Sequence, residues 1–250
     1  MGAVRWIGGV LGWASFGPIG GLIGYFLGSV VDRHLDRILL LSGAGYPARS
    51  ARGYSATEQR NSFMVSLLVL SSAVIRADGR TLQSELDYVK DFVRRNFGDA
   101  AVPEAMRMLD ELGRQNIDIY SVGRQIASYM NYSQRLQLFH YLTQIAIADG
   151  EFSKSEKTVL ESIAAAIGIS AADAASVISM FFKDTGSAYS VLGISPSATD
   201  DEVKTAYRRM AMKNHPDKVA TLGPEVQKAA AEKFRQIQEA YEAIKRERGL

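Results

Sequence analysis

Cysteine is absent from the 250 residues of the chain, and histidine occurs three times, as His34, His140 and His215. The absence of cysteine excludes disulfide bonds, thiolate zinc sites and cysteine nucleophiles. With so few imidazoles, a histidine-rich metal site or histidine-dependent catalysis is hard to assemble. No phosphate-binding loop of the G-x-x-x-x-G-K type is present either. We therefore expect that the chain is not itself an enzyme.

A strong net charge is also lacking. The 29 lysine and arginine residues nearly balance the 27 aspartate and glutamate residues, which leaves a formal charge of +2. Bulk electrostatics therefore gives no indication of nucleic-acid binding, and we expect no nucleic-acid partner. The length allows one large or two smaller domains.

The N-terminal stretch from Trp6 to Val31 has no charged side chain. At about 1.5 Å per residue, a helix of this length could cross a hydrocarbon core of roughly 30 Å. We predict that residues 1–36 form a glycine-rich membrane segment. Gly20, Gly24 and Gly28 recur at a spacing of four, which lets two helices approach closely in lipid and would favour a homodimer.

Other interpretations of this segment remain open. Pro18 and the glycines are also compatible with a re-entrant hairpin or a buried hairpin in a soluble protein, because a glycine inside a helix costs about 1 kcal/mol in water. A cleaved signal peptide fits poorly, since the apolar run is too long and no suitable cleavage site follows it. Arg5 alone precedes the run, whereas four arginines follow it between Arg33 and Arg52, which places the bulk of the chain in the cytoplasm.

Helical periodicity begins after a linker. Residues 37–56 are rich in glycine, serine and arginine and are predicted to be that linker. Residues 57–185 show apolar side chains at intervals of three and four and are predicted to form a helical bundle. One predicted apolar stripe consists of Phe63, Leu67, Leu68, Val74 and Ile75, and another of Leu136, Phe139, Leu142, Ile145 and Ala146.

An internal repeat lies within the bundle. The tripeptide Ala-Asp-Gly occurs at residues 77–79, followed by Glu85, and again at residues 148–150, followed by Glu156. The glycine is predicted to end one helix in a left-handed conformation, and the glutamate to lie at the start of the next, where the helix dipole favours it.

With these motifs, the central part of the chain resembles the TerB-like helical domain. The resemblance implies a divalent-metal site in the acidic loops, formed by Asp78, Glu85, Asp149 and Glu156. Helix capping is the alternative interpretation of the same residues, and it is the one we prefer. We expect no other cofactor.

Several local features of the bundle are also predicted. Gly113 and Gly123 should interrupt the helices between residues 107 and 132. His140 should be a core or boundary residue with a hydrogen-bond partner rather than a ligand. Ser170 should cap a new helix after Gly168 ends the previous one.

A helix with one apolar and one basic face is predicted from Glu202 to about Asn214. Its apolar face carries Val203, Tyr207 and Met210, and its basic face carries Lys204, Arg208 and Arg209. Thr199 is the predicted N-cap. Because the residue before a proline is disfavoured in a helix, His215 and Asp217 should lie in a turn beyond its end.

These residues, with their neighbours, resemble a J-domain in order and identity. The matching motifs are YSVLG from Tyr189, the basic helix, His215-Pro216-Asp217, Lys233-Phe234 and Gln238 to Tyr241. The resemblance implies a co-chaperone that docks on a DnaK-type chaperone and triggers its ATP hydrolysis. We assign this domain to residues 187–250. The predicted chaperone-binding residues are Lys204, Tyr207, Arg208, Arg209, Lys213, His215, Pro216 and Asp217.

The resemblance and the charges of these side chains imply a role for each of them. Lys204, Arg208 and Arg209 would dock on an acidic surface, and Asp217 would pair with a cationic group of the partner. The returning helix is expected from Ala230 to Glu247, after an extended loop. The predicted core consists of Leu192, Val203, Tyr207, Met210, Phe234, Ile237 and Tyr241.

The order of segments resembles membrane-anchored J-proteins of the DjlA type. The resemblance implies an all-α chain with an N-terminal glycine-rich membrane segment, a central TerB-like helical bundle and a C-terminal J-domain helical hairpin. It would pass once through the bacterial inner membrane, with both domains in the cytoplasm. The central domain would recruit clients or sense a signal. Two alternatives are a metal or envelope-stress sensor that uses the J-domain only to recruit a chaperone, and a passive membrane scaffold.

Overall fold

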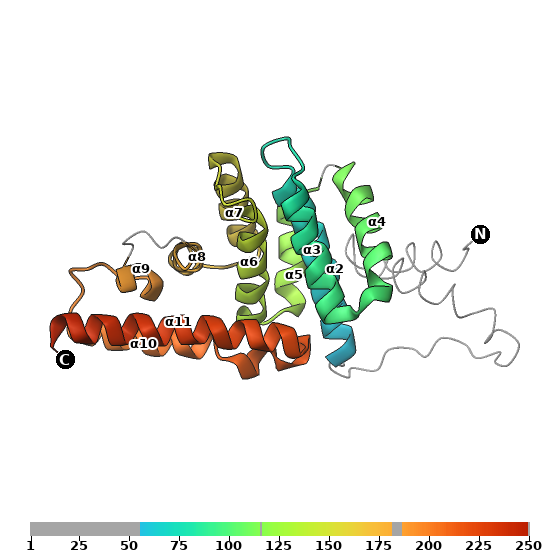
Figure 1. The fold of residues 1–250 in the computed structure, drawn as a ribbon. Helices are drawn as coiled ribbons and strands as arrows, with labels where there is room; N and C mark the ends of the chain where they lie inside the picture. Colours follow the sequence, from blue (N-terminus) through green and yellow to red (C-terminus); the bar gives the residue numbers. More distant parts are fainter. Residues whose placement is uncertain (1–55, 116, 182–186, 250) are drawn as a thin grey trace, which may run out of the picture. The chain divides into compact units, whose positions relative to one another are not determined.

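The computed structural model describes residues 56–115, 117–181 and 187–249 (Figure 1). Within these ranges every regular element is a helix, so the all-α prediction is confirmed for the part of the chain that is described. The predicted membrane segment, the spacing of Gly20, Gly24 and Gly28, and all of the linker up to residue 55 lie outside the described residues. None of the described helices combines the length and the apolar character needed to cross a membrane.

The helices form a central bundle followed by a C-terminal group. The bundle contains α2 (Ala56–Ile75), α3 (Gln83–Phe97), η1 (Asp99–Ala101), α4 (Val102–Gly113), α5 (Ile119–Tyr129), α6 (Tyr132–Ala146), α7 (Lys154–Ala166) and α8 (Ala171–Ser179). The C-terminal group contains α9 (Ser187–Leu192), α10 (Asp200–Lys213), η2 (Pro216–Leu222) and α11 (Pro224–Arg248). The bundle from Leu67 onward and the C-terminal group belong to one compact unit.

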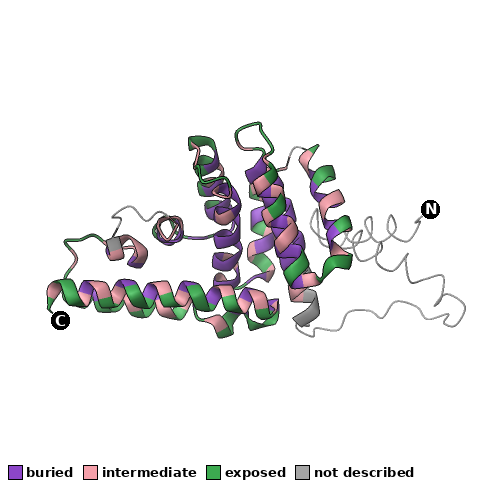
Figure 2. Ribbon diagram, viewed as in Figure 1, coloured by how far each residue is buried: buried purple, intermediate pink, exposed green. Residues whose placement is uncertain are grey.

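Helix α6 forms the middle of this bundle and contacts α3, α5, α7, α8 and η2. Its predicted stripe begins at Leu136 and ends at Ala146, and all of the stripe residues are buried, with exposures of at most 1%. Leu138, His140 and Tyr141 are buried as well, so α6 is covered on more than the one predicted face (Figure 2). The stripe predicted on α2 is also buried. Each fully buried leucine or phenylalanine contributes about 1.5–3 kcal/mol to folding.

Gly123 does not interrupt a helix, contrary to the prediction, because it lies inside α5. A Cβ atom at this position would lie 2.4 Å from the Cβ of Ala166 and 2.7 Å from its carbonyl carbon. The glycine therefore permits α5 and α7 to approach closely, and packing rather than helix breaking explains it. Gly113, by contrast, is the last residue of α4, as predicted.

The helix boundaries around the repeats follow local rules. Gly79 and Gly150 have positive φ, as predicted, and lie in the turns after α2 and α6. The Ser170 hydroxyl accepts a hydrogen bond from the Asp173 amide at 3.2 Å, so Ser170 is the predicted N-cap of α8.

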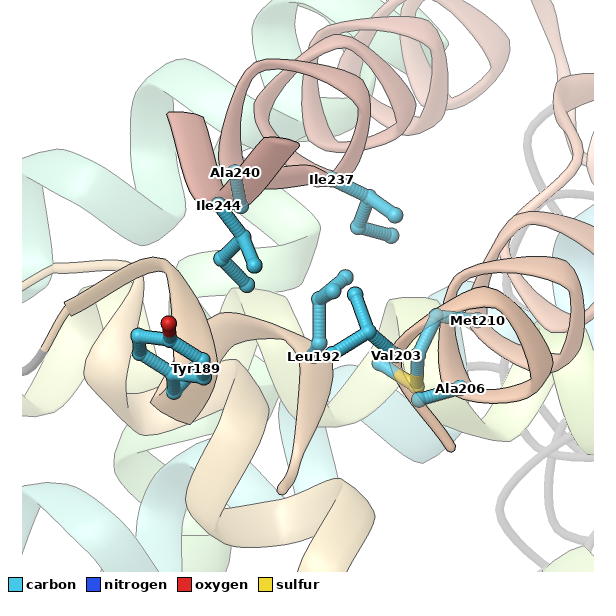
Figure 3. Packing of buried hydrophobic residues seen from close by; sticks show 8 residues of the cluster. All are labelled: Tyr189, Leu192, Val203, Ala206, Met210, Ile237, Ala240 and Ile244. Carbon is cyan, nitrogen blue, oxygen red and sulfur yellow. The ribbon is translucent and has the colours of Figure 1, made fainter. Parts of the chain in front are cut away.

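Helices α10 and α11 run in opposite directions, joined by η2, and α9 packs against α11 (Figure 1). Figure 3 shows their shared core, in which α9, α10 and α11 all contribute side chains. The buried cluster consists of Tyr189, Leu192, Val203, Ala206, Met210, Ile237, Ala240 and Ile244. Four predicted core residues, namely Leu192, Val203, Met210 and Ile237, are thus confirmed.

Three other predicted core residues lie outside the buried cluster. Tyr207 and Tyr241 are half-buried at its edge and stack on each other with ring centroids 4.2 Å apart. Phe234 is half-buried and meets the ring of His215 edge-on at 5.6 Å. On α11 it lies beside the buried stripe that contains Ala230, Lys233 and Ile237, and this position at the edge of the stripe explains its partial exposure.

Helix α11 begins at Pro224, six residues before the predicted start at Ala230. Gly223 adopts φ of 110°, a conformation that other residues avoid, and Pro224 then takes the first helical position. Proline suits that position because its fixed φ is helical and its missing N–H is not needed there. The segment predicted as an extended loop is therefore η2 plus the first turns of α11.

Candidate functional site

The basic helix α10 begins and ends where the sequence predicts. The Thr199 hydroxyl accepts a hydrogen bond from the Glu202 amide, and the Glu202 carboxylate accepts one from the Thr199 amide at 2.7 Å. At the other end, Asn214 is buried and its side-chain amide donates to the carbonyl of Met210 at 2.8 Å. Both ends are thus fixed by hydrogen bonds over three or four residues.

The turn after α10 is held by the imidazole of His215. The backbone amide of Asp217 donates to His215 Nδ1 at 3.3 Å, and the amide of Lys218 donates to the His215 carbonyl at 3.0 Å. Pro216 opens η2 with its ring at the first position. The His215 side chain is 47% exposed and that of Asp217 is 79% exposed. The turn therefore presents a carboxylate to solvent from a constrained backbone.

The exposed cations of α10 differ in their internal contacts. Lys204 and Arg208 are exposed, and Lys204 Nζ lies 3.9 Å from the Asp201 carboxylate. Arg209 is also exposed, but its guanidinium donates to the carbonyl of Leu192 at 3.3 Å. Arg209 therefore ties α10 to α9 in addition to carrying charge on the surface.

Lys213 points toward the central bundle. Its Nζ lies 2.7 Å from Asp173 Oδ2 on α8 and 4.9 Å from the centroid of the Tyr132 ring. The Lys213 side chain is 29% exposed, whereas Asp173 is 2% exposed. Among the eight predicted chaperone-binding residues, Lys213 is thus held by the central bundle, and Tyr207 is held by its stacking on Tyr241.

Lys233 on α11 is a buried cation that the sequence analysis treated only as a motif residue. It is 2% exposed, and its Nζ lies 3.5 Å from the carbonyl oxygen of Leu136. Burial lowers the pKa of Lys233 to about 7, although the charge of Asp173 opposes this shift. Its spacing from Ala230 and Ile237 places it on the buried stripe of α11, and this spacing was a signal available in the sequence.

His140 is buried in α6, as predicted, at 6% exposure. Its Nδ1 has no hydrogen-bond partner among the described residues, which differs from the expected hydrogen-bonded histidine. Burial, together with the nearby charge of Lys233, holds the pKa of His140 well below its usual value. The imidazole is therefore neutral at physiological pH and acts as a packing residue.

The acidic residues of the two repeats carry local hydrogen bonds. Glu85 accepts from the amide of Leu82 at 2.9 Å, and Glu156 accepts from the amide of Ser153 at 2.7 Å. In the preceding turns, Asp78 accepts from the amide of Arg80, and Asp149 accepts from the amide of Glu151. These bonds support the interpretation as helix capping and turn formation.

The same four carboxylates are close enough to interact electrostatically. Burial raises the pKa of Glu85 to about 7, and the charges of Glu156, Asp78 and Asp149 add to the shift. Within the described residues, however, no group of three or more histidine, cysteine or acidic side chains has the arrangement to hold a metal ion. A divalent metal in these loops therefore stays a prediction.

Comparison with known protein families accounts for the three parts of the chain. Residues 187–248 match the DnaJ domain, residues 64–178 match the family described as tellurite resistance protein TerB, and residues 1–52 match the co-chaperone DjlA transmembrane domain. In the content and order of its domains, the chain matches the DjlA type of J-domain protein. All three resemblances stated from the sequence are thereby confirmed. The N-terminal match also indicates membrane anchoring of this DjlA-type protein.

Curated DjlA proteins resemble this chain over nearly its full length. The protein named "Co-chaperone protein DjlA" from Coxiella burnetii is 29% identical over 98% of this chain and 97% of its own length. Proteins of the same name from Photobacterium profundum and Haemophilus influenzae are each 25% identical, and the alignments cover 97% or more of both chains. No solved structure gives a significant match.

Proposed function

We propose that this chain is a membrane-anchored co-chaperone whose J-domain binds a DnaK-type chaperone and stimulates its ATP hydrolysis. The observation that carries the proposal is the turn in which His215 caps the backbone and leaves the Asp217 carboxylate exposed. The DnaJ-domain match and the naming of the curated relatives as co-chaperones also support it. The catalytic groups belong to the partner, so this chain regulates an enzyme without being one.

The chemistry of docking follows from the charges around the turn. Lys204 and Arg208, which are exposed on α10, would steer the domain onto an acidic surface of the chaperone. Asp217 would then pair with a cation at the junction between the nucleotide and substrate domains of the partner. If this contact is stronger in the hydrolysing conformation than in the other, binding shifts the chaperone toward the hydrolysing conformation.

The direct test measures single-turnover ATP hydrolysis by a DnaK-type chaperone with the full chain in detergent or nanodiscs. Asp217→Asn should abolish the stimulation, because the amide keeps the shape of the side chain but removes its charge. Asp110→Asn is the matched control, since Asp110 lies on α4 and its side chain is 63% exposed. Equal stimulation by the wild-type chain and Asp217→Asn would contradict the proposal.

For the anchor, we propose a single pass through the bacterial inner membrane with both folded domains in the cytoplasm. The excess of arginine after the apolar run and the DjlA transmembrane match support this orientation. Because the chain has no cysteine, single cysteines introduced at Ala3 and Ser55 can be labelled separately. A membrane-impermeant maleimide should label them from opposite sides. Labelling of both from the same side would instead indicate a re-entrant hairpin.

A homodimer through Gly20, Gly24 and Gly28 is part of the same proposal. Their spacing would let two membrane helices pack closely and bring two J-domains to one target. Exchange of the three glycines for leucine should reduce crosslinking in detergent. Undiminished crosslinking would rule out this face as the dimer contact.

A second candidate function is a sensor centred on the TerB-like bundle, which would use the J-domain only to recruit a chaperone. The raised pKa of Glu85 favours this candidate, because a buried carboxylate near three others would gain from binding a cation. Calorimetric titration of the full chain with calcium and with zinc tests it. Saturable binding that is lost in Glu85→Gln and Glu156→Gln would support the sensor. The absence of any heat of binding would contradict it.

A further inference from the structure

Two lysines, one on each of the helices α10 and α11, contact the central bundle. Lys213, the last residue of α10, forms an ion pair with Asp173 on α8 at 2.7 Å. Lys233, in the first half of α11, is buried against the carbonyl of Leu136 on α6. The bundle thus covers a cation on each helix that borders the turn.

Asp173 is arranged to receive an ammonium group. The Ser170 hydroxyl donates to Asp173 Oδ2 at 2.7 Å, and the Tyr132 hydroxyl donates to the same oxygen. Burial alone would raise the pKa of Asp173, but the hydrogen bonds from Lys213, Tyr132 and Ser170 lower it overall. The carboxylate is therefore ionised at neutral pH, and Lys213 supplies its counter-charge.

The contact between the bundle and the J-domain extends beyond this pair. The Ser176 hydroxyl on α8 donates to the carbonyl of Val191, and the side-chain amide of Gln134 donates to the Thr221 hydroxyl at 3.5 Å. Helix α6 contacts η2, and α8 contacts α9. The covered surface therefore spans α9, the end of α10, η2 and the first half of α11.

Lys233 opposes this contact energetically. A buried ammonium group loses its hydration, and the Leu136 carbonyl at 3.5 Å lies at the limit of a hydrogen bond. The closed arrangement thus combines a favourable ion pair at Lys213 with an unfavourable burial at Lys233. The burial of Lys233 therefore offsets part of the stabilisation that the Lys213 ion pair contributes, so a binding partner needs less free energy to release the J-domain.

We propose that the central bundle restrains the J-domain through the contact between Asp173 and Lys213, and that a DnaK-type chaperone competes with this contact. An acidic surface of the chaperone would take Lys213 from Asp173. The inference rests on the function proposed above. If the chaperone binds only the released J-domain, its apparent affinity is reduced by the fraction that is released. Weakening the contact should then lower the half-saturating concentration, which is the concentration of this chain that gives half-maximal stimulation of the chaperone ATPase. The maximal stimulation should stay unchanged.

The first test compares Asp173→Asn with wild type in the chaperone ATPase assay, using the full chain. The substitution removes the charge that holds Lys213, whereas the amide can still accept hydrogen bonds from Ser170 and Tyr132. We expect the half-saturating concentration to fall about five- to tenfold. Asp110→Asn on α4 is the control and should leave it unchanged. An unchanged or higher value for Asp173→Asn would overturn the inference.

A second variant should act in the opposite direction. Lys233→Met keeps an unbranched side chain but removes the buried ammonium, so it should strengthen the closed arrangement. We expect its half-saturating concentration to rise by a similar factor. If Asp173→Asn and Lys233→Met shift that concentration in the same direction, competition between bundle and chaperone is excluded.

A distance measurement separates this inference from the proposed function. Glu161 on α7 and Glu239 on α11 are each more than half exposed, and the absence of cysteine allows spin labels at Glu161→Cys and Glu239→Cys. Asp173→Asn should broaden the measured distance distribution, and Lys233→Met should narrow it. If every variant fails to stimulate the ATPase, that failure contradicts the proposed function alone. A distribution that Asp173→Asn leaves unchanged would overturn the restraint.

Discussion

The backbone amide of Asp217 donates a hydrogen bond to Nδ1 of His215, so the histidine caps the turn that contains the aspartate. Because Nδ1 accepts this bond, the proton of the neutral imidazole resides on Nε2. The ring is also supported by Phe234 at 5.6 Å. The Asp217 carboxylate remains 79% exposed and available to a partner.

This geometry predicts an unequal effect of two substitutions at His215. Asparagine places its Oδ1 near the position of the imidazole Nδ1 and can accept the same backbone hydrogen bond, whereas alanine cannot. We expect His215→Ala to reduce stimulation of the chaperone ATPase at least tenfold. His215→Asn should retain a measurably larger share. Equal loss in both variants would show that the backbone cap is not the role of the histidine.

Arg208 and Arg209 are neighbours on α10 with different predicted roles. Arg208→Ala should weaken docking and reduce its salt dependence without changing the thermal midpoint. Arg209→Ala should do the same and also lower the free energy of unfolding by about 0.5–1.5 kcal/mol, because it removes the hydrogen bond to the Leu192 carbonyl. ATPase titrations at two salt concentrations and thermal unfolding check both effects. Arg124→Ala on α5, which is exposed, is the control. Identical thermal midpoints for the two variants would contradict the assignment for Arg209.

The raised pKa of Glu85 predicts a pH dependence of stability. Its pKa is about 7 in the folded protein against 4.5 as the ordinary value, so the folded state binds more protons between these values. Stability should therefore fall as pH rises from 4.5 to 7. Glu85→Gln should weaken this slope and raise the stability at pH 8, since its Oε1 can still accept from the Leu82 amide. Chemical unfolding at several pH values measures both. A slope that is the same in wild type and variant would refute the prediction.

Gly123 and Gly113 provide a matched pair for packing. Gly123→Ala would place a methyl group 2.4 Å from Ala166 Cβ and should destabilise the protein by about 1–3 kcal/mol. At Gly113 the nearest atom would be Arg76 Cδ at 4.0 Å, so Gly113→Ala should be neutral or stabilising by up to about 1 kcal/mol. Denaturant unfolding of the two variants tests the difference. Similar values for both would show that α5 and α7 are free to separate.

Much of the site was predictable because its hydrogen bonds are local. Thr199, Ser170 and Asn214 each bond to a residue three or four positions away, and His215 bonds to a residue two positions away. Such contacts depend on side-chain chemistry and spacing, which the sequence displays directly. The apolar stripes of α2 and α6 were predictable for the same reason, since helical periodicity fixes which residues share a face.

The start of α11 shows where a local signal was overlooked. The loop expected before Ala230 contains the Gly223-Pro224 pair, which is itself a helix-start signal. Phe234 was placed in the core because it shares the spacing of buried residues. Periodicity identifies the apolar side of the helix, but only packing shows which residues at the edge of that side stay partly exposed.

Most helix ends, the caps and the turn that presents Asp217 can be inferred from the sequence, because each depends on neighbours within one helical turn. Only the packing of the helices brings Lys213 to Asp173, 40 residues away, and Lys233 to Leu136, 97 residues away. Packing likewise explains Gly123, which allows α5 to approach Ala166 on α7 closely. Charge and size at each position are visible in the sequence. Whether a lysine is solvated or buried depends on which distant helix covers it, and that is settled only when the helices pack.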